Sequence, residues 1–308
     1  MAVFILKRIL FTAAVGVGIV FFSFFGLSMA SNSHARAPSY DPRPHARTSV
    51  RATSRYLGNL LRGDLGEFDD RVGRQTRRLS VAARLAKVYP RSLGLLGAAL
   101  AVAVIFGVPL GTLAATLKHS ALSTTTLVIT LLGISLPSFF LAALLQMGEI
   151  GWYRVTGSRL VPVGGFGWDA HLVLPALVLS ARPLAHLARM AFVSLRDIEG
   201  EDYVRTARAK GLPRRIVLGV HEARNAAVPM LTALAVSLRF SLASLPVVEY
   251  FFGWPGIGEA LLDAVRAGQS QAVASMALAV GLTFMLVNLA LDILYRYADP
   301  RLRARAVS

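Results

Sequence analysis

Two arginines interrupt apolar segments of the chain, at positions where a charged side chain could bind an anion. Arg182 lies in the segment 171–192, and Arg239 lies in the segment 226–248. Arginine stays protonated and presents a planar fork of N–H donors that matches a carboxylate. Because a charge at the centre of a membrane costs about 2.5–3.5 kcal/mol, it normally faces a cavity or a partner. Arg182 and Arg239 therefore either pair with acidic or carbonyl groups of a neighbouring subunit, or line a path for solutes that carry carboxylates.

A second set of residues, at 201–212, combines charge with a narrow apolar stripe. Acidic residues open this segment and basic residues close it, which is the order that the helix dipole favours, and Gly211 with Pro213 ends a helix. The apolar positions share one helical face: Tyr203, Val204, Ala207 and Gly211. A second short helix is predicted over 214–225. Such a helix pair could lie on lipid headgroups or dock into a partner protein.

Other kinds of chemistry are excluded by what the sequence lacks. The chain has no cysteine, which excludes disulfides, thiolate nucleophiles and cysteine-bound metals. None of its four lysines follows a glycine, so no phosphate-binding loop of an ATPase is present. His221 and Glu222 are followed by Asn225, where a zinc protease needs a second histidine. We therefore predict no catalytic residue and no metal site.

The elements that must position these residues are membrane-spanning helices. Of the 308 residues, 55% are hydrophobic and only 16% are charged, too few for a water-soluble surface. Four uncharged runs can each cross a bilayer, which needs about 20 apolar residues: 9–33, 92–117, 120–148 and 268–291. The two segments that contain the arginines must also be helices, because lipid cannot satisfy backbone polar groups. The predicted fold is all-α, with about six transmembrane helices.

Charge predicts the orientation of the chain, because basic residues accumulate on the cytoplasmic side. Lys7 and Arg8 precede the first helix, the loop 196–224 has a net charge of +2, and four arginines lie in the tail. We expect both termini and this loop to be cytoplasmic. Residues 31–91 carry a net charge of +8 but lie outside in this arrangement, which a loop of that length tolerates. The net charge of +16 is thus read as a topology signal, and no nucleic-acid partner is predicted.

Three parts of the chain follow from this arrangement. Residues 1–30 form the first transmembrane helix, although a cleaved signal peptide is the alternative. Residues 31–91 form an extracytoplasmic loop with a small helical cap, in which 31–53 is poorly ordered and 56–65 and 74–88 are helical. Residues 92–308 form a five-helix core.

Two loops of the core are expected at membrane surfaces. Residues 148–169, rich in aromatic residues and glycine, are predicted to be an interfacial loop. An outer-face turn follows the fifth span and could cap the pathway, contact another protein or anchor in the interface: Gly253, Trp254, Pro255 and Gly256.

The segment 201–212 resembles the cytoplasmic signature loop of binding-protein-dependent ABC importers. Further segments are similar, in order and spacing, to the dipeptide and oligopeptide permease branch: Arg224-Asn225-Ala226 with Pro229, Leu61-Arg62-Gly63-Asp64-Leu65-Gly66, Ser135-Leu136-Pro137-Ser138-Phe139, Leu174-Pro175-Ala176-Leu177, Val247-Val248-Glu249, Phe252-Gly253-Trp254-Pro255-Gly256-Ile257-Gly258 and Asp299-Pro300-Arg301. The resemblance covers nearly everything after Tyr56. The sequence departs from it at Arg182 and Arg239, where the family generally has small or apolar residues.

The resemblance implies an inner-membrane permease subunit with the type I ABC importer fold, which forms a translocation path for peptides. It implies that a coupling helix in 196–224 docks into an ATPase through these residues: Tyr203, Val204, Arg205, Thr206, Ala207, Arg208, Lys210, Gly211 and Leu212. It also implies that the chain binds no cofactor, because partner subunits bind ATP and Mg. The implied partners are a second homologous permease, two ATPase subunits or one fused ATPase, an extracytoplasmic solute-binding protein and membrane lipid.

Two alternative functions make different demands on the sequence. A secondary transporter driven by an ion gradient would carry solute without ATP and would show paired discontinuous helices. A membrane-embedded hydrolase would need a nucleophile, a base and an orienting group, and the sequence offers no such set.

Overall fold

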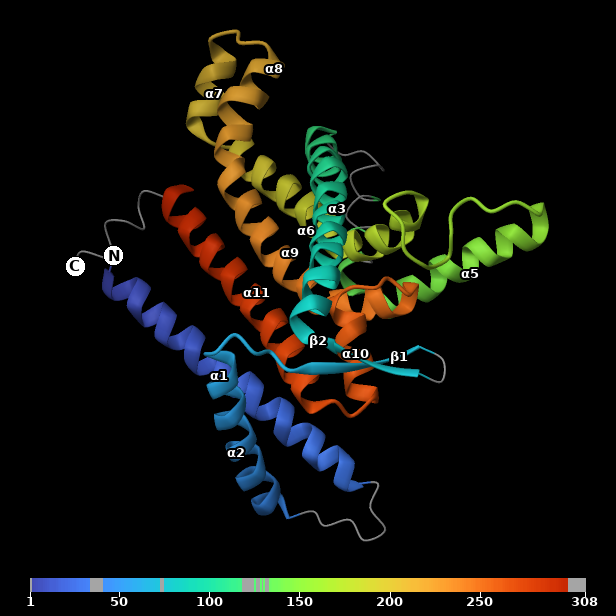
Figure 1. Cartoon of the computed structure of the whole chain (residues 1–308). Coiled ribbons are helices and arrows are strands. Elements are labelled where there is room, and N and C mark those ends of the chain that lie inside the picture. The colour runs from blue at the N-terminus through green and yellow to red at the C-terminus, as the bar shows by residue number, and fades with distance from the viewer. Residues whose placement is uncertain are drawn as a thin grey trace. The chain divides into compact units, whose positions relative to one another are not determined.

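The computed structural model describes residues 2–33, 41–72, 75–117, 125, 128, 130 and 133–298, and most of them are helical (Figure 1). Among these residues, five helices are long and apolar enough to cross a membrane: Arg8–Ser31, Val81–Thr116, Ala170–Glu199, Ala223–Phe252 and Ser270–Ala290. The sixth predicted span, 122–147, is described at 125, 128, 130 and 133–147, and its residues 138–147 belong to a shorter helix, α5 (Ser138–Thr156). The chain forms two compact units, Met1–Ser92 with Pro255–Asn288 and Leu93–Trp254 with Leu289–Ser308.

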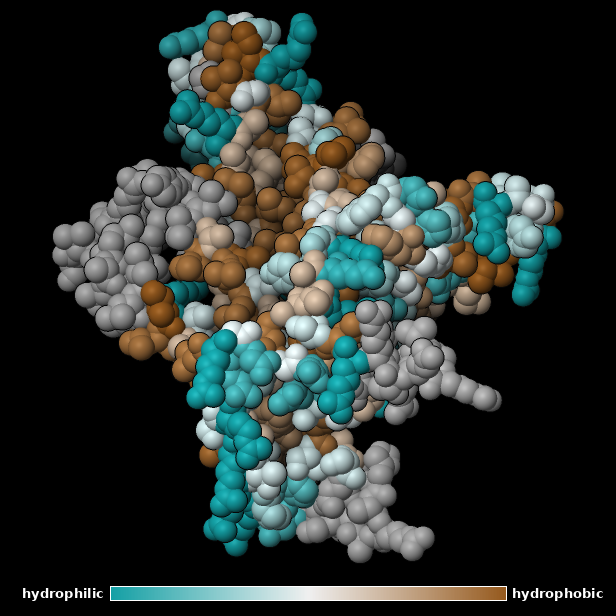
Figure 2. Space-filling view, in the orientation of Figure 1, coloured by the Kyte–Doolittle hydropathy of each residue, from teal (hydrophilic) through white to brown (hydrophobic). Residues whose placement is uncertain are grey.

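The first unit combines long apolar helices with a short polar cap. Its elements are α1 (Ala2–Ser33), α2 (Pro42–Leu60), β1 (Glu67–Val72), β2 (Gln75–Ser80), the start of α3 (Val81–Thr116), α10 (Ile257–Arg266) and most of α11 (Ser270–Ala298). Hydrophilic residues cover the visible face of α2 (Figure 2). Its buried face carries Tyr56, whose hydroxyl lies 2.7 Å from Ser275 Oγ, and Ser275 in turn donates to the carbonyl of Leu65 at 2.7 Å. These bonds tie the cap to α11.

The cap corrects two sequence predictions. Residues 42–60 form a helix where 31–53 was predicted to be poorly ordered, because Asp41 caps it by accepting from the N–H of Arg43 and Pro42 occupies its first turn. Residues 75–80 form a strand where 74–88 was predicted to be helical, and α3 begins only at Val81. The strands pair antiparallel, and the N–H of Val81 donates to the carbonyl of Gly66 at the base of the hairpin. The fold is therefore helical with one small hairpin among its described elements.

The second unit contains the helices that carry the predicted functional residues. Its elements are the rest of α3, α5 (Ser138–Thr156), η1 (Ala170–Leu172), α6 (Val173–Glu199), α7 (Asp202–Ala209), α8 (Arg214–Ile216), η2 (Val217–Glu222) and α9 (Ala223–Phe252). Helices α6 and α9 pack along much of their length, and the first part of α5 packs on both (Figure 1). The rest of α5 extends beyond them, so the first half of the predicted interfacial loop is helical.

The second short helix, predicted over 214–225, also differs from the structure. The single turn α8 continues directly into η2, a π-helical stretch, and η2 runs directly into α9. No glycine or proline separates Val220 from the start of α9, so nothing in the local sequence ends the helix there. The wider π turn joins the short helices to a transmembrane helix without a break.

Close backbone contact joins α3 to α6. A Cβ atom at Gly107 would lie 2.7 Å from the carbonyl oxygen of Leu184, and one at Gly111 would lie 2.8 Å from the Cβ of Ala191. Helices in lipid associate mainly by van der Waals packing, which small residues allow by letting backbones approach. The two glycines, one helical turn apart, therefore set the separation of α3 and α6.

We predict that Gly111→Val destabilises the protein by about 1–3 kcal/mol, because the new side chain would overlap α6. Purified protein in detergent should show a fall of roughly 5 °C in Tm. Gly97→Val is the matched control, because Gly97 lies in the same helix and a Cβ there would meet no atom within 4 Å. Equal Tm values for the two variants would contradict the close contact.

Candidate functional site

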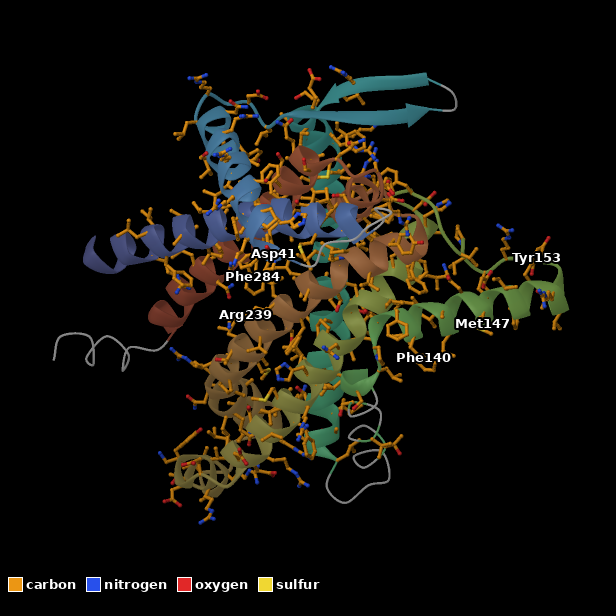
Figure 3. All side chains as sticks on the ribbon, turned by 90° about the horizontal axis from the view of Figure 1, so that it is seen from below. Asp41, Phe140, Met147, Tyr153, Arg239 and Phe284 are labelled. Atoms are coloured by element: carbon orange, nitrogen blue, oxygen red, sulfur yellow. The ribbon has the colours of Figure 1, made fainter. Side chains whose placement is uncertain are left out.

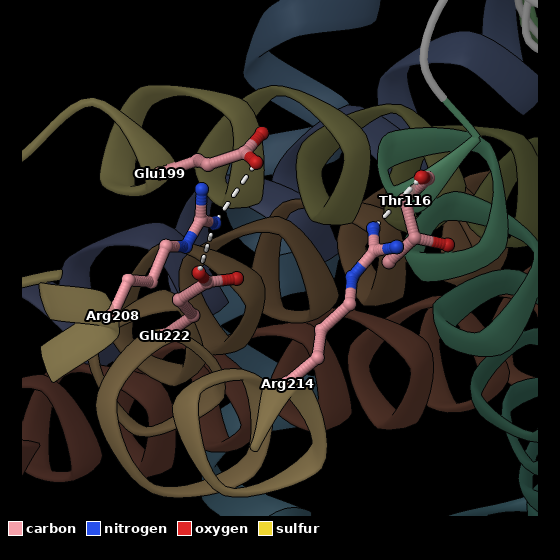
Figure 4. Close-up of polar contacts among 5 residues, drawn as sticks. All are labelled: Thr116, Glu199, Arg208, Arg214 and Glu222. Carbon is pink, nitrogen blue, oxygen red and sulfur yellow. Dashed lines mark hydrogen bonds and ion pairs between the residues drawn. The ribbon is translucent and has the colours of Figure 1, made fainter. Parts of the chain in front are cut away.

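At one end of the second unit, a single arginine connects three helical segments (Figure 4). Arg208 of α7 donates to Glu199 at the end of α6 at 2.9 Å, and to Glu222 of η2 at 3.1 Å. The Glu222 side chain is only 7% exposed, whereas that of Arg208 is 44% exposed. The hydrogen bond to Glu199, followed by that to Glu222, raises the pKa of Arg208, so its guanidinium stays charged. Arg208 thus fixes α7 against the ends of both long helices.

Packing divides the nine predicted coupling residues into two groups. Val204 and Ala207 are buried against Val217 and Ile198, so they attach α7 to its own chain and cannot contact a partner. Docking of this segment into an ATPase stays a prediction, in which Val204 and Ala207 hold α7 in position and the exposed residues make the contact. The exposed members are Tyr203, Arg205, Thr206, Arg208, Lys210, Gly211 and Leu212. They form, with the exposed Ile216 and Val220, the surface that we call the α7–η2 face.

Other hydrogen bonds hold the α7–η2 face in place. Asn225 donates to the hydroxyl of Tyr203 at 3.0 Å, and Arg214 donates to the carbonyl of Thr116 at the end of α3 at 2.8 Å. Gly211 has a φ of +76°, a left-handed conformation that lets the chain turn after α7. The predicted helix stop is therefore present, and the face is anchored to α3, α6 and α9.

At the other end of the unit, the predicted outer-face turn follows α9. Gly253 ends the helix in the left-handed region, with a φ of 59°, and Gly256 precedes α10. The Trp254 side chain is fully buried among aromatic rings, with centroids 4.9 Å from Phe166 and 5.5 Å from Trp168. Within this chain it is therefore a packing residue, and it does not reach lipid or another protein from the surface.

Two polar residues near this end were not singled out from the sequence. Gln146 donates from its amide nitrogen to the carbonyls of Val163 and Phe251, at 2.8 and 3.1 Å. The buried Glu149 accepts from the backbone N–H groups of Leu160 and Val161, at 2.9 and 3.4 Å. The two residues lie one helical turn apart on α5. This spacing alone does not predict that their side chains bind the loop after α5.

The two intramembrane arginines lie on different helices. Arg182 of α6 stacks over the ring of Phe240, with its guanidinium carbon 5.1 Å from the ring centroid. Arg239 of α9 (Figure 3) has a buried Nε with no hydrogen-bond partner in the described part of the chain. Among the described residues, neither arginine forms an ion pair. Arg182 lines a cavity beside the start of α5, and Arg239 does not line that cavity, so the two residues predicted to act together have different surroundings.

The described residues contain no group of three histidine or acidic side chains that could hold a metal ion. The side chain of His221 lies outside the described part of the structure, as does that of Asp292. The polar residues that the structure does bring together, Glu199, Arg208 and Glu222, form an ion-paired network with no nucleophile.

Comparisons of the sequence with family models and with known proteins agree on one family. Residues 107–304 match the model of the binding-protein-dependent transport system inner membrane component. The chain is 36% identical over 271 residues to the di/tripeptide transport system permease protein DppB of Pseudomonas aeruginosa, covering 80% of this chain and 79% of that one. It is 35% identical over 251 residues to the glutathione transport system permease protein GsiC of Escherichia coli K12, covering 80% and 78%.

A solved structure shows the same fold. The inward-facing MetNI methionine ABC transporter contains a chain that superposes with a TM-score of 0.55, covering 71% of this chain and 97% of that one. Because the two sequences are only 17% identical, this likeness concerns the fold alone.

We predict that Arg208→Gln loosens α7 and η2, because it leaves the buried Glu222 carboxylate without its cation and facing Glu199. Loss of a partner from a buried polar group costs about 1–3 kcal/mol, so amide hydrogen exchange within 202–222 should accelerate by roughly 5- to 150-fold. Arg205→Gln is the control, because within the described residues Arg205 pairs with the exposed Asp202, at 3.5 Å, where ion pairs contribute little. Similar exchange in both variants would refute the connecting role.

Proposed function

Because the chain belongs to the family of binding-protein-dependent transport system inner membrane components, we propose that it is the permease subunit of an ATP-driven peptide importer. The observation that carries this proposal is that the family match spans the helices of the second unit, including the anchored α7–η2 face. The names of the relatives DppB and GsiC support short peptides, including glutathione, as the solutes. In this proposal the chain performs no covalent chemistry and forms the path through which the solute passes.

The α7–η2 face is proposed to be the docking surface for an ATPase subunit. Its exposed apolar residues, Tyr203, Leu212, Ile216 and Val220, lie among basic side chains on short helices beyond the membrane spans. The bond from Arg214 to Thr116 and the contacts of Arg208 connect this surface to three long helices. A movement of the ATPase would therefore be transmitted to α3, α6 and α9 together, as alternating access requires.

The apolar surface of α5 supports a membrane environment and a second permease subunit as a partner. Phe140, Met147 and Tyr153, labelled along α5 in Figure 3, are 44%, 69% and 44% exposed. Hydrophobic residues also cover the visible middle part of α9 (Figure 2). Exposed apolar helices of this length are suited to lipid or to another helix bundle. A solute-binding protein on the outside and one fused or two separate ATPases inside complete the proposed complex, with ATP and Mg bound by the ATPases.

We predict that the complex, reconstituted with its ATPase, second permease and binding protein, takes up a labelled dipeptide only when ATP is supplied. Uptake should persist when ionophores remove all ion gradients. Uptake that requires an ion gradient and does not depend on ATP would instead support a secondary transporter.

In the same assay, Gly211→Val should retain ATP hydrolysis but lose most peptide uptake. Valine at a positive φ is strained by at least about 1–2 kcal/mol, so the chain after α7 would be displaced from its docking position. Gly219→Val is the matched control, because Gly219 lies in η2, also has open space around it and has no positive φ. Normal coupling in the Gly211 variant would remove this residue from the docking surface.

The proposed topology places both termini and the loop 196–224 in the cytoplasm and 31–91 outside. Because the chain has no cysteine, Arg55→Cys and Arg205→Cys each introduce a single thiol. Both native side chains are exposed, so both thiols should be accessible to reagent on their own side of the membrane. An impermeant maleimide should label position 55 in intact cells whose outer membrane has been permeabilised, and position 205 only after the inner membrane is opened. The reverse pattern would invert the topology.

A further inference from the structure

A cavity of about 230 Å³ lies where the start of α5 meets the middle of α6 and α9. Its wall includes Arg182 of α6, Ser138 of α5, and Phe240, Ser241 and Ser244 of α9. Arg182 is nine residues from the start of α6, or about 14 Å along the helix. The cavity therefore lies beside the middle of α6, a helix that is long enough to cross a membrane. Polar groups at this depth are costly unless a ligand, water or partner satisfies them.

Arg182 supplies a positive charge to this cavity. Its guanidinium stacks on the face of Phe240, which holds the plane of the group while leaving the N–H donors at its edge available. No carboxylate in the described part of the chain pairs with it. The charge is thus positioned by an aromatic ring and is not neutralised within the described structure.

The N-terminus of α5 adds a second source of positive potential. Pro137 is the N-cap residue and has no side chain that can accept from the first helical N–H groups. Its carbonyl accepts only from Phe140 and Leu141, both at 3.1 Å. The helix has 19 residues, and the amide groups at its N-terminus carry a partial positive charge that favours an anion. Both Pro137 and Ser138 line the cavity.

Ser241 provides independent support for a ligand. It is only 2% exposed, and its Oγ has no hydrogen-bond partner among the described residues. A buried hydroxyl without a partner costs free energy, so such groups normally have one. Because Ser241 lines the same cavity as Arg182, an oxygen atom bound by the arginine would also be available to accept from this hydroxyl.

We propose that this cavity binds the carboxylate of a passing solute, such as the C-terminal carboxylate of a short peptide. Arg182 and the N-terminus of α5 attract the charge, and Ser241 donates a hydrogen bond. The volume is below the roughly 300–1,000 Å³ of pockets that enclose whole ligands, so the cavity holds the charged end only. This site rests on the proposed import function and assigns it a solute class. Arg239 does not line the cavity and is not part of the site.

The test compares uptake of labelled Ala-Ala with uptake of its C-terminal amide by the full reconstituted complex. The variants are Arg182→Gln, Arg182→Lys and Ser241→Ala, with Arg189→Gln as a control for an exposed arginine on the same helix. Because the same binding protein serves every complex, its own preference cancels when variants are compared. The measured quantity is the ratio of acid to amide uptake relative to the unmodified complex.

Arg182→Gln should reduce this ratio about tenfold, because it removes a charge-assisted hydrogen bond. Ser241→Ala should reduce it about threefold, which corresponds to a neutral hydrogen bond. Arg182→Lys should restore much of the loss, and Arg189→Gln should leave the ratio unchanged.

Three results would overturn the site. An unchanged ratio in both Arg182→Gln and Ser241→Ala would show that no carboxylate is bound there. Equal loss of acid and amide uptake would show a structural role for these residues. Loss of the second permease from the purified Arg182→Gln complex would show that Arg182 pairs with the partner subunit. If the unmodified complex shows no ATP-dependent uptake of either peptide, the proposed import function itself fails.

Discussion

The hydrocarbon of a membrane offers no hydrogen-bond partner to a peptide group, and every long element of this protein follows from that constraint. The chain satisfies its backbone inside helices, and within its described residues five of them are long and apolar enough to cross a bilayer. With no hydrophobic force between helices in lipid, contact depends on shape, and Gly107 and Gly111 let α3 approach the backbone of α6. Prolines lie within α6 and α9, which membrane helices tolerate because neighbouring helices, side chains or waters can satisfy the freed backbone groups.

Because of the same constraint, most charged residues lie at the ends of the helices. There, ion pairs between them hold the ends together. Glu199 and Glu222 belong to segments that arrive at one end from different directions, and Arg208 joins them through one guanidinium. The short helix α7 would have little stability alone, because eight residues are fewer than an isolated helix needs. Its position depends on this ion-paired network and on the buried contact of Val204 with Val217. In the proposed complex, a small helix held in this way would move together with the ends of α6 and α9.

Arg182 is an exception to this distribution of charge. Its guanidinium lies on an apolar helix, stacked on Phe240, and faces a cavity with an uncapped helix N-terminus and a buried hydroxyl. An apolar residue would pack in this place without the cost of a buried charge. Each of the three features offers a hydrogen-bond donor or a positive electrostatic potential. Together they are therefore complementary to an anion. A site of this kind must release its ligand, which suits a small contact along a transport path better than a pocket that encloses the whole solute.

The sequence alone determined the features that depend on neighbouring residues. Apolar runs identified the long helices, the order of charges identified α7, and Gly211 marked its end, because each signal lies within a few residues. Asp41 and Pro42 also carried a local signal for α2, which the polar composition of the segment obscured. The hairpin at 67–80 was missed because its strands are stabilised by pairing with each other and not by their own pattern. Tertiary structure decided which coupling residues are buried, because Val204 and Ala207 pack against Val217 of a different helical segment. It also decided that Arg182 lines the cavity beside α5 and that Arg239 does not, since the wall is formed by three helices whose contributions no local pattern relates.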